Sequence, residues 1–236
     1  MYRAIRLIDR VTDYALLLFF LLLFAIGGYT MYDTVLIYDL AGGDDLRSFR
    51  PMAVESEDGA FVWDMSALSE DVVAWLTVDD TNIDYPVMQG ADNNEYLNKD
   101  PFGAYSLAGS IFLDARNAPD FTDPYSLIYG HHMEYGRMFG ALDAFLEEDY
   151  FESHRAGTLT VAGTVYTIDF FACLEADASV EQIFAPTETV GTLDYVRDNA
   201  VIFREPTGER LVALSTCKFP QTTERIIVFG VLLNEQ

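Results

Sequence analysis

The stretch 214–230, LSTCKFPQTTERIIVFG, joins two apolar runs through a short polar loop. The first run, RLVALSTC at 210–217, ends with Cys217, and the second, RIIVFGVLL at 225–233, begins with Arg225. Both are short and rich in β-branched residues, which is typical of β-strands. Because the loop is short, we expect two antiparallel neighbours. Arg225 would then lie beside Cys217.

Side chains on a strand point alternately to its two faces. Positions 213, 215 and 217 should therefore share one face of the first strand, and positions 212, 214 and 216 the other. Cys217 would end its strand at the rim of the sheet.

Most of the chain beyond residue 81 shows the same strand pattern. Short apolar runs separated by Gly, Pro, Asn and Asp occur at 82–89, 109–115, 126–132 and 158–174, besides the two runs above. Strands at such spacing predict a closed or nearly closed β-barrel. Two segments have a helical pattern instead, at 138–151 and 190–203.

A further helix is predicted within SALSEDVVAWLTV at 66–78. Ser69 is a suitable N-cap, and acidic residues follow it in the first turn. Apolar residues then recur at 72, 73, 75 and 76.

The amino-terminal part contains an uncharged apolar run, YALLLFFLLLFAIGGYTM at 14–31, long enough to span a bilayer. Arginines precede it and aspartates follow it, so the positive-inside rule predicts a cytoplasmic amino terminus. We expect a cytoplasmic segment at 1–13, a transmembrane anchor at 14–32, an extracytoplasmic stalk at 33–60 and a catalytic domain at 61–236. A cleaved signal peptide is the alternative.

The net charge of the chain is −24, with 38 acidic against 14 basic residues. Such a surface repels nucleic acids, so a nucleic-acid partner is not expected.

Three residues could form an acyl-transfer site. A thiolate at Cys217 would attack a carbonyl, Arg225 would stabilise the oxyanion, and His131, near the end of the run at 126–132, would protonate the leaving amine. From spacing alone, a buried structural Cys217 is equally compatible, as is a disulfide with Cys173. No ligand-like spacing indicates a metal, so neither metal nor cofactor is expected.

The sequence resembles the class B sortases. The matching runs are DVVAWLTVDDTNIDYPVMQGADNNEYL, GSIFLDARN, LIYGHHMEYGRMFGAL and LSTC followed by RIIVFG, in the family's order. The resemblance implies a mainly β fold: an eight-stranded sortase barrel with an amino-terminal helical extension, a helix before the cysteine strand, and one transmembrane helix in front.

The resemblance also implies a cysteine transpeptidase. Such an enzyme cuts a carboxy-terminal sorting signal after threonine, holds a thioacyl intermediate, and passes the product to an amine of the cell wall or of a pilin. By position, Cys217 is the nucleophile, His131 the acid/base and Arg225 the oxyanion arginine.

Four further positions resemble groove residues of the family, and each also has a plain structural interpretation. They are Asn93, Leu97, Ile183 and Ser215. The chain departs from some relatives by having Lys218 after the cysteine, which leaves the signal and the acceptor open.

The expected partners are surface proteins bearing a sorting signal, a peptidoglycan precursor or pilin amine, and the membrane. The expected location is the cell membrane, with the catalytic domain outside. Two alternative functions remain open: a non-catalytic peptide-binding barrel and a cysteine hydrolase using the same site.

Overall fold

The computed structural model describes residues 2–41, 44–51, 53–55, 61–63, 68–186, 191–218 and 222–234. The chain divides into two compact units, Met1–Asp39 and Leu40–Gln236. Each unit is described by itself.

The first unit consists of a single helix, α1, which runs over Tyr2–Ala41 and ends in the second unit. Its segment Ile5–Tyr38 is long and apolar enough to cross a membrane, and none of it is buried within the protein. The predicted anchor at 14–32 lies within this helix.

In the segment expected to be a stalk, the described residues after α1 form two short elements. They are a four-residue helix, α2 (Asp44–Arg47), and the strand β1 (Ala53–Glu55), which pairs with β2 (Phe61–Trp63). The rest of the predicted stalk, at 42–43, 52 and 56–60, lies outside the described residues.

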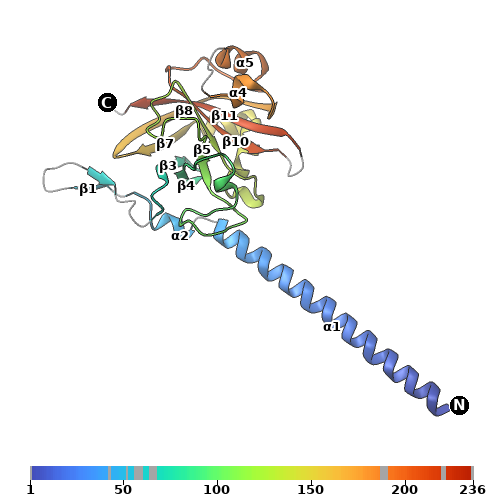
Figure 1. Ribbon diagram of the computed structural model, residues 1–236. Helices are drawn as coiled ribbons and strands as arrows, with labels where there is room; N and C mark the ends of the chain where they lie inside the picture. Colours follow the sequence, from blue (N-terminus) through green and yellow to red (C-terminus); the bar gives the residue numbers. More distant parts are fainter. Residues whose placement is uncertain are drawn as a thin grey trace. The chain divides into compact units, whose positions relative to one another are not determined.

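Eight strands of the second unit form a closed barrel (Figure 1). They are β3 (Val72–Val78), β4 (Asp84–Met88), β5 (Ile111–Leu113), β6 (Tyr125–Tyr129), β7 (Ala156–Val161), β8 (Thr164–Asp177), β10 (Leu211–Cys217) and β11 (Glu224–Asn234). Their order is β11-β10-β6-β5-β4-β3-β7-β8, and pairing of β8 with β11 closes the ring. A ninth strand, β9 (Ile202–Phe203), pairs with the second half of β8. The predicted eight-stranded barrel is confirmed.

Two hydrophobic clusters lie on opposite faces of β10, which ends with Cys217, and of its neighbour β11. The inner cluster receives side chains from all eight barrel strands and fills the barrel; it includes Val212 and Leu214. The outer cluster includes Ala213 and Ile227 and is covered by Ile183 and Val196. The alternation predicted for 210–217 is therefore confirmed.

The predicted helix at 66–78 is wrong for the described residues of this segment, because Val72–Val78 forms the strand β3. Its residues pair with β4 on one side and with β7 on the other. Ser69 does not cap a helix; its hydroxyl accepts a hydrogen bond from the Asp71 amide at 3.4 Å. β-branched residues such as Val72 and Val73 suit a strand, and the two neighbouring strands provide ladder hydrogen bonds that an isolated segment lacks.

The two other predicted helices are confirmed, with changed bounds. The segment 138–151 forms a 3-10 helix, η3 (Gly140–Leu146), followed by α3 (Glu148–Ser153), because Glu147 between them is extended. The segment 190–203 forms α5 (Thr192–Asn199) and then β9. Together with the shorter α4 (Glu181–Phe184), α5 lies in the connection before the cysteine strand (Figure 1).

Candidate active site

Parallel pairing of β6 with β10 brings His131 close to Cys217. In this register Tyr129 is opposite Ser215. Beyond the last pair, the Gly130 amide donates a hydrogen bond to the Ser215 carbonyl at 3.1 Å, and the Thr216 hydroxyl donates one to the Gly130 carbonyl at 2.9 Å. His131 and Cys217 are thus the second residues past the same register pair, at the carboxyl ends of adjacent strands.

Antiparallel pairing on the other side of β10 brings in the arginine. Cys217 is the direct register partner of Arg225 at the start of β11, as the sequence predicted. Directly opposed residues of an antiparallel pair point to the same face, so the thiol and the guanidinium share one side of the sheet.

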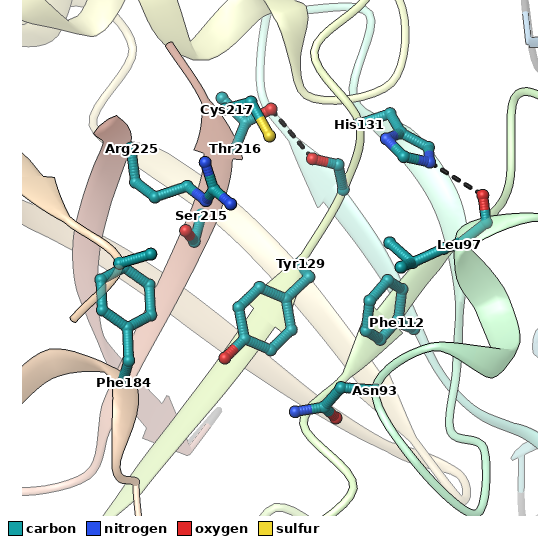
Figure 2. Close-up of a pocket in the computed structure, with 12 residues that line it drawn as sticks. Asn93, Leu97, Phe112, Tyr129, His131, Phe184, Ser215, Thr216, Cys217 and Arg225 are labelled. Carbon is teal, nitrogen blue, oxygen red and sulfur yellow. Dashed lines mark hydrogen bonds between the residues drawn. The ribbon is translucent and has the colours of Figure 1, made fainter. Parts of the chain in front are cut away.

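These three residues line one pocket of about 380 Å³. Its other lining residues are Asn93, Leu97, Phe112, Tyr129, Gly130, Ala178, Phe184, Ser215 and Thr216. Figure 2 shows the Cys217 sulfur and the His131 ring facing each other across it, with the Arg225 side chain next to the cysteine. Apolar walls around a few converging polar groups are typical of a ligand site.

The His131 ring is oriented by the backbone of the 3-10 helix η1 (Glu95–Leu97). Its Nε2 lies 2.8 Å from the carbonyl oxygen of Leu97. Because a carbonyl can only accept, Nε2 carries a hydrogen, and Nδ1 is the nitrogen left to exchange a proton. Figure 2 shows this second nitrogen on the side of the ring toward Cys217.

The Arg225 guanidinium is held by the backbone at the start of its own strand. Nη1 donates to the carbonyls of Thr222 at 3.1 Å and Glu224 at 3.3 Å. A guanidinium has five N–H donors, and within the part of the chain that the structure describes only those on Nη1 have a hydrogen-bond partner. An arginine anchored through one amino group can present the others to an anion.

A hydrogen-bonded turn supports the loop in front of Arg225. Asp177, at the end of β8, accepts hydrogen bonds from the amide and hydroxyl of Ser179 and from the hydroxyl of Thr223. These bonds lower the pKa of Asp177 to about 2, with a smaller contribution from the Arg225 charge. The carboxylate therefore stays ionised beside the pocket at neutral pH.

Three of the four predicted groove residues line the pocket: Asn93, Leu97 and Ser215. The structure does not bring Ile183 there; its side chain is fully buried in the outer cluster, and the next residue, Phe184, lines the pocket instead. The Ser215 hydroxyl is 1% exposed as a residue and has no hydrogen-bond partner among the described residues. The residue lines the pocket, and the hydroxyl oxygen itself is buried in its wall.

The sequence analysis missed six pocket residues, and three of them are aromatic: Phe112, Tyr129 and Phe184. Phe112 and Tyr129 come from adjacent strands, and their ring centroids lie 5.3 Å apart. The alternation of β6 could have shown that Tyr129 shares a face with Leu127, but nothing in the sequence shows which face carries the pocket.

Both cysteines are free thiols, so the structure contains no disulfide between them. Cys173 is fully buried in the inner cluster, whereas Cys217 is half-buried in the pocket. Burial raises the pKa of the Cys173 thiol, and the nearby Glu175 charge raises it further. Only Cys217 is placed to react.

Two neighbours of the candidate site are engaged elsewhere. The Nε2 of His132 lies 2.7 Å from Oδ2 of Asp143. The ammonium of Lys218, directly after the cysteine, lies 2.8 Å from a carboxylate oxygen of Glu175 on β8. Both side chains are thus held by carboxylates at the rim.

Comparison with known proteins agrees with this geometry. The family model of the sortase domain matches residues 76–233. The chain is 33% identical over 183 residues to sortase B of Listeria monocytogenes, covering 73% of this chain and 74% of the relative.

Solved structures of the same class are also similar. A Streptococcus pyogenes class B sortase involved in pilus biogenesis superposes with a TM-score of 0.65 and 42% identity, covering 70% of this chain and 94% of the other. A substrate complex of Staphylococcus aureus sortase B gives a TM-score of 0.65 at 27% identity, covering 71% and 82%.

Proposed function

Because the chain belongs to the class B sortases, a family of cysteine transpeptidases, we propose that it cleaves a carboxy-terminal sorting signal after threonine and joins the new carboxyl end to an amine. The nucleophile is Cys217, the acid/base His131 and the oxyanion-binding residue Arg225. The observation that carries this proposal is the convergence of these three side chains from three strands on one pocket.

The first half of the reaction forms a thioester. The Cys217 thiol gives its proton to Nδ1 of His131, and the resulting thiolate attacks the threonine carbonyl carbon. The developing oxyanion receives hydrogen bonds from N–H groups of the Arg225 guanidinium. As the carbon–nitrogen bond breaks, His131 gives its Nδ1 proton to the leaving amine. The signal's downstream part departs, and the upstream protein stays bound to sulfur.

The second half reverses these roles. An incoming amine attacks the thioester carbonyl, His131 takes a proton from it, and the thiolate of Cys217 leaves. The net result is exchange of one amide bond for another. The acceptor is the amine of a peptidoglycan precursor or of a pilin.

The groove residues bind the signal around the threonine. The hydroxyl of Ser215, which has no partner among the described residues, and the amide of Asn93 offer hydrogen bonds, and Leu97 contributes an apolar surface. Ile183 acts indirectly, as the packing residue that holds Phe184 at the pocket.

The helix α1 anchors the enzyme in the cell membrane as a single span, with the amino terminus in the cytoplasm and the catalytic domain outside. Its apolar segment and the arginines before it support this orientation. The division at 13, 32 and 60 predicted from the sequence is retained in this proposal.

Intact-mass spectrometry of the full chain in detergent, exposed to a library of sorting-signal peptides, tests the function. We expect a mass increase at Cys217 that hydroxylamine removes, because hydroxylamine cleaves thioesters. Cys217→Ala should lose the adduct, whereas the matched variant Cys173→Ala should keep it. An adduct on Cys217→Ala would refute the nucleophile.

Product analysis separates transfer from its two alternatives. With an added amine, a transpeptidase yields the amide of that amine, whereas a hydrolase yields the free acid regardless of amine. Peptide binding that survives in Cys217→Ala, without any adduct on the wild type, would identify a binding module and overturn the proposal.

A further inference from the structure

The segment after β5 places a buried carboxylate behind the pocket. Asp114 is 0% exposed. Its Oδ1 accepts hydrogen bonds from the amide of Arg116 at 3.0 Å and from Nε of Arg116 at 2.8 Å. Its Oδ2 accepts from Nη2 of the same guanidinium at 2.7 Å. The two side chains therefore form a forked pair.

The same carboxylate holds two side chains that line the pocket. Nδ2 of Asn93 lies 2.9 Å and the hydroxyl of Tyr129 lies 3.0 Å from Oδ2 of Asp114. The Ala115 amide donates to Oδ1 of Asn93 at 2.8 Å. These bonds identify Oδ1 and Nδ2 of the Asn93 amide, since Oδ1 accepts and Nδ2 donates. The second N–H of Nδ2 remains to donate a hydrogen bond to a ligand.

The Asp114 carboxylate is suited to this role. Burial alone would raise its pKa, but the bonds from Arg116 and Asn93 outweigh burial and hold the pKa below its usual value. Burial raises the pKa of the Tyr129 hydroxyl, as does the charge of Asp114. Near neutral pH the carboxylate accepts and the phenol donates.

Arg116 also reaches the opposite wall of the pocket. Its Nη2 donates a second hydrogen bond, at 2.7 Å, to the carbonyl of Phe184 at the end of α4. The neighbouring Ile183 carbonyl accepts a hydrogen bond from Tyr125 at 2.9 Å. These are the carbonyls that a helix end leaves without an intrahelical partner. In Figure 2, Phe184 and Asn93 lie on either side of Tyr129.

We propose that Arg116 and Asp114 form a clamp that sets the width of the signal-binding groove by joining the Asn93 side to the Phe184 side. Both are positioning residues, since Arg116 and Asp114 are not among the pocket-lining residues. The inference rests on the proposed function for its substrate, a peptide, but the clamp itself is a property of the structure.

Arg116→Lys is the appropriate variant. An ammonium keeps a cation beside the buried carboxylate, which protects the fold, but it lacks the planar fork that reaches Asp114 and the Phe184 carbonyl together. The matched control is Arg155→Lys. Arg155 likewise bonds a carboxylate, Asp169 at 2.9 Å, and a backbone carbonyl, that of Phe170 at 3.4 Å, and it does not line the pocket.

The first measurement is amide hydrogen exchange of the full chain. We expect the amides at 183–185, which bond to the carbonyls of Val180 and Glu181, to exchange about tenfold faster in Arg116→Lys, the equivalent of one charge-assisted hydrogen bond. Arg155→Lys should leave them unchanged. Equal exchange in wild type and Arg116→Lys would overturn the clamp.

The second measurement is steady-state cleavage of the peptide that acylates the wild type. We expect KM to rise about tenfold in Arg116→Lys with kcat changed less than about threefold. The variant weakens peptide binding but leaves Cys217, His131 and Arg225 in place. The rate of Cys217 alkylation by iodoacetamide should be unchanged. The proposal would be overturned if kcat and the rate of Cys217 alkylation both fell, or if KM stayed unchanged.

The two measurements separate the clamp from the proposed function. If no peptide acylates the wild type, the transpeptidase proposal fails. The exchange comparison then still decides whether Arg116 fixes the α4 wall.

Discussion

Replacing Gly130 with alanine tests how tightly the backbone before His131 is packed. A Cβ on Gly130 would lie 2.7 and 2.8 Å from Cδ2 and Cγ of Phe139, and closer still to Cδ1 of Ile111. Carbon atoms in contact are normally about 3.5–4.0 Å apart, so the overlap with Phe139 is roughly 0.7–1.3 Å. Both neighbours are at most 1% exposed, so neither can turn into solvent.

The overlap must be relieved by shifting the backbone or the core, which costs about 1–3 kcal/mol of unfolding free energy. For a domain of this size, that corresponds to a decrease in Tm of about 2–12 °C. The shift also moves His131, the next residue, and a displacement of about 1 Å can lower a reaction rate on the order of 100-fold.

Thermal unfolding and peptide cleavage, measured on the same preparations, check both effects. The control is Gly208→Ala, where the added Cβ would lie 3.2 Å from Leu233 and 3.5 Å from Val231. There we expect a stability change within about 0.5 kcal/mol and normal turnover. A Gly130→Ala protein with wild-type Tm and wild-type kcat would refute the packing argument.

Two further changes address the reacting groups. Arg225→Lys should lower kcat by about 100- to 1000-fold with little change in KM, because an ammonium cannot donate to two backbone carbonyls and an oxyanion in one plane. The control is Arg197→Lys, on the exposed face of α5. Normal turnover by Arg225→Lys would contradict the oxyanion role. In the native protein, an alkylating reagent followed by peptide mapping should modify Cys217 at least about 100-fold faster than Cys173, whose pKa burial raises. Comparable labelling of both thiols before unfolding would show that the inner cluster is open.

The strands could be predicted because their signals are local. The alternation in 210–217 and the short loop after it give both the face of Cys217 and its antiparallel partner Arg225, and the register confirms both. Apolar runs bounded by Gly, Pro and Asp likewise gave β4, β5 and β6, whereas the single run predicted at 158–174 covers two strands, β7 and β8. No knowledge of the rest of the fold is needed for such patterns.

The predicted helix at 66–78 was wrong for the opposite reason. Ser69 followed by acids and spaced apolar residues satisfies the local rules of a helix start. The strand β3 forms there because β4 and β7 occupy its two edges, and those strands lie elsewhere in the sequence. Tertiary pairing overrides a local preference of this size.

The sequence alone suggested an acyl-transfer site at Cys217, His131 and Arg225 but left a structural cysteine equally compatible, and the family resemblance decided between the two. The proximity of His131 to Cys217 depends on the parallel pairing of β6 with β10, which has no local signal. The clamp residues Asp114 and Arg116 fall in a run that carried the resemblance, yet their contacts with Asn93 and Phe184 join three distant segments. Residue type alone could not reveal this role.

The order of the strands along the chain has a consequence for biosynthesis. His131 follows β6, but Cys217 ends β10 and Arg225 is the second residue of β11, the last strand described. Chains emerge from the ribosome amino end first, at about 5–20 residues per second. In a nascent chain, the pocket of His131, Cys217 and Arg225 therefore cannot form until the final strands are released and β11 pairs with β8.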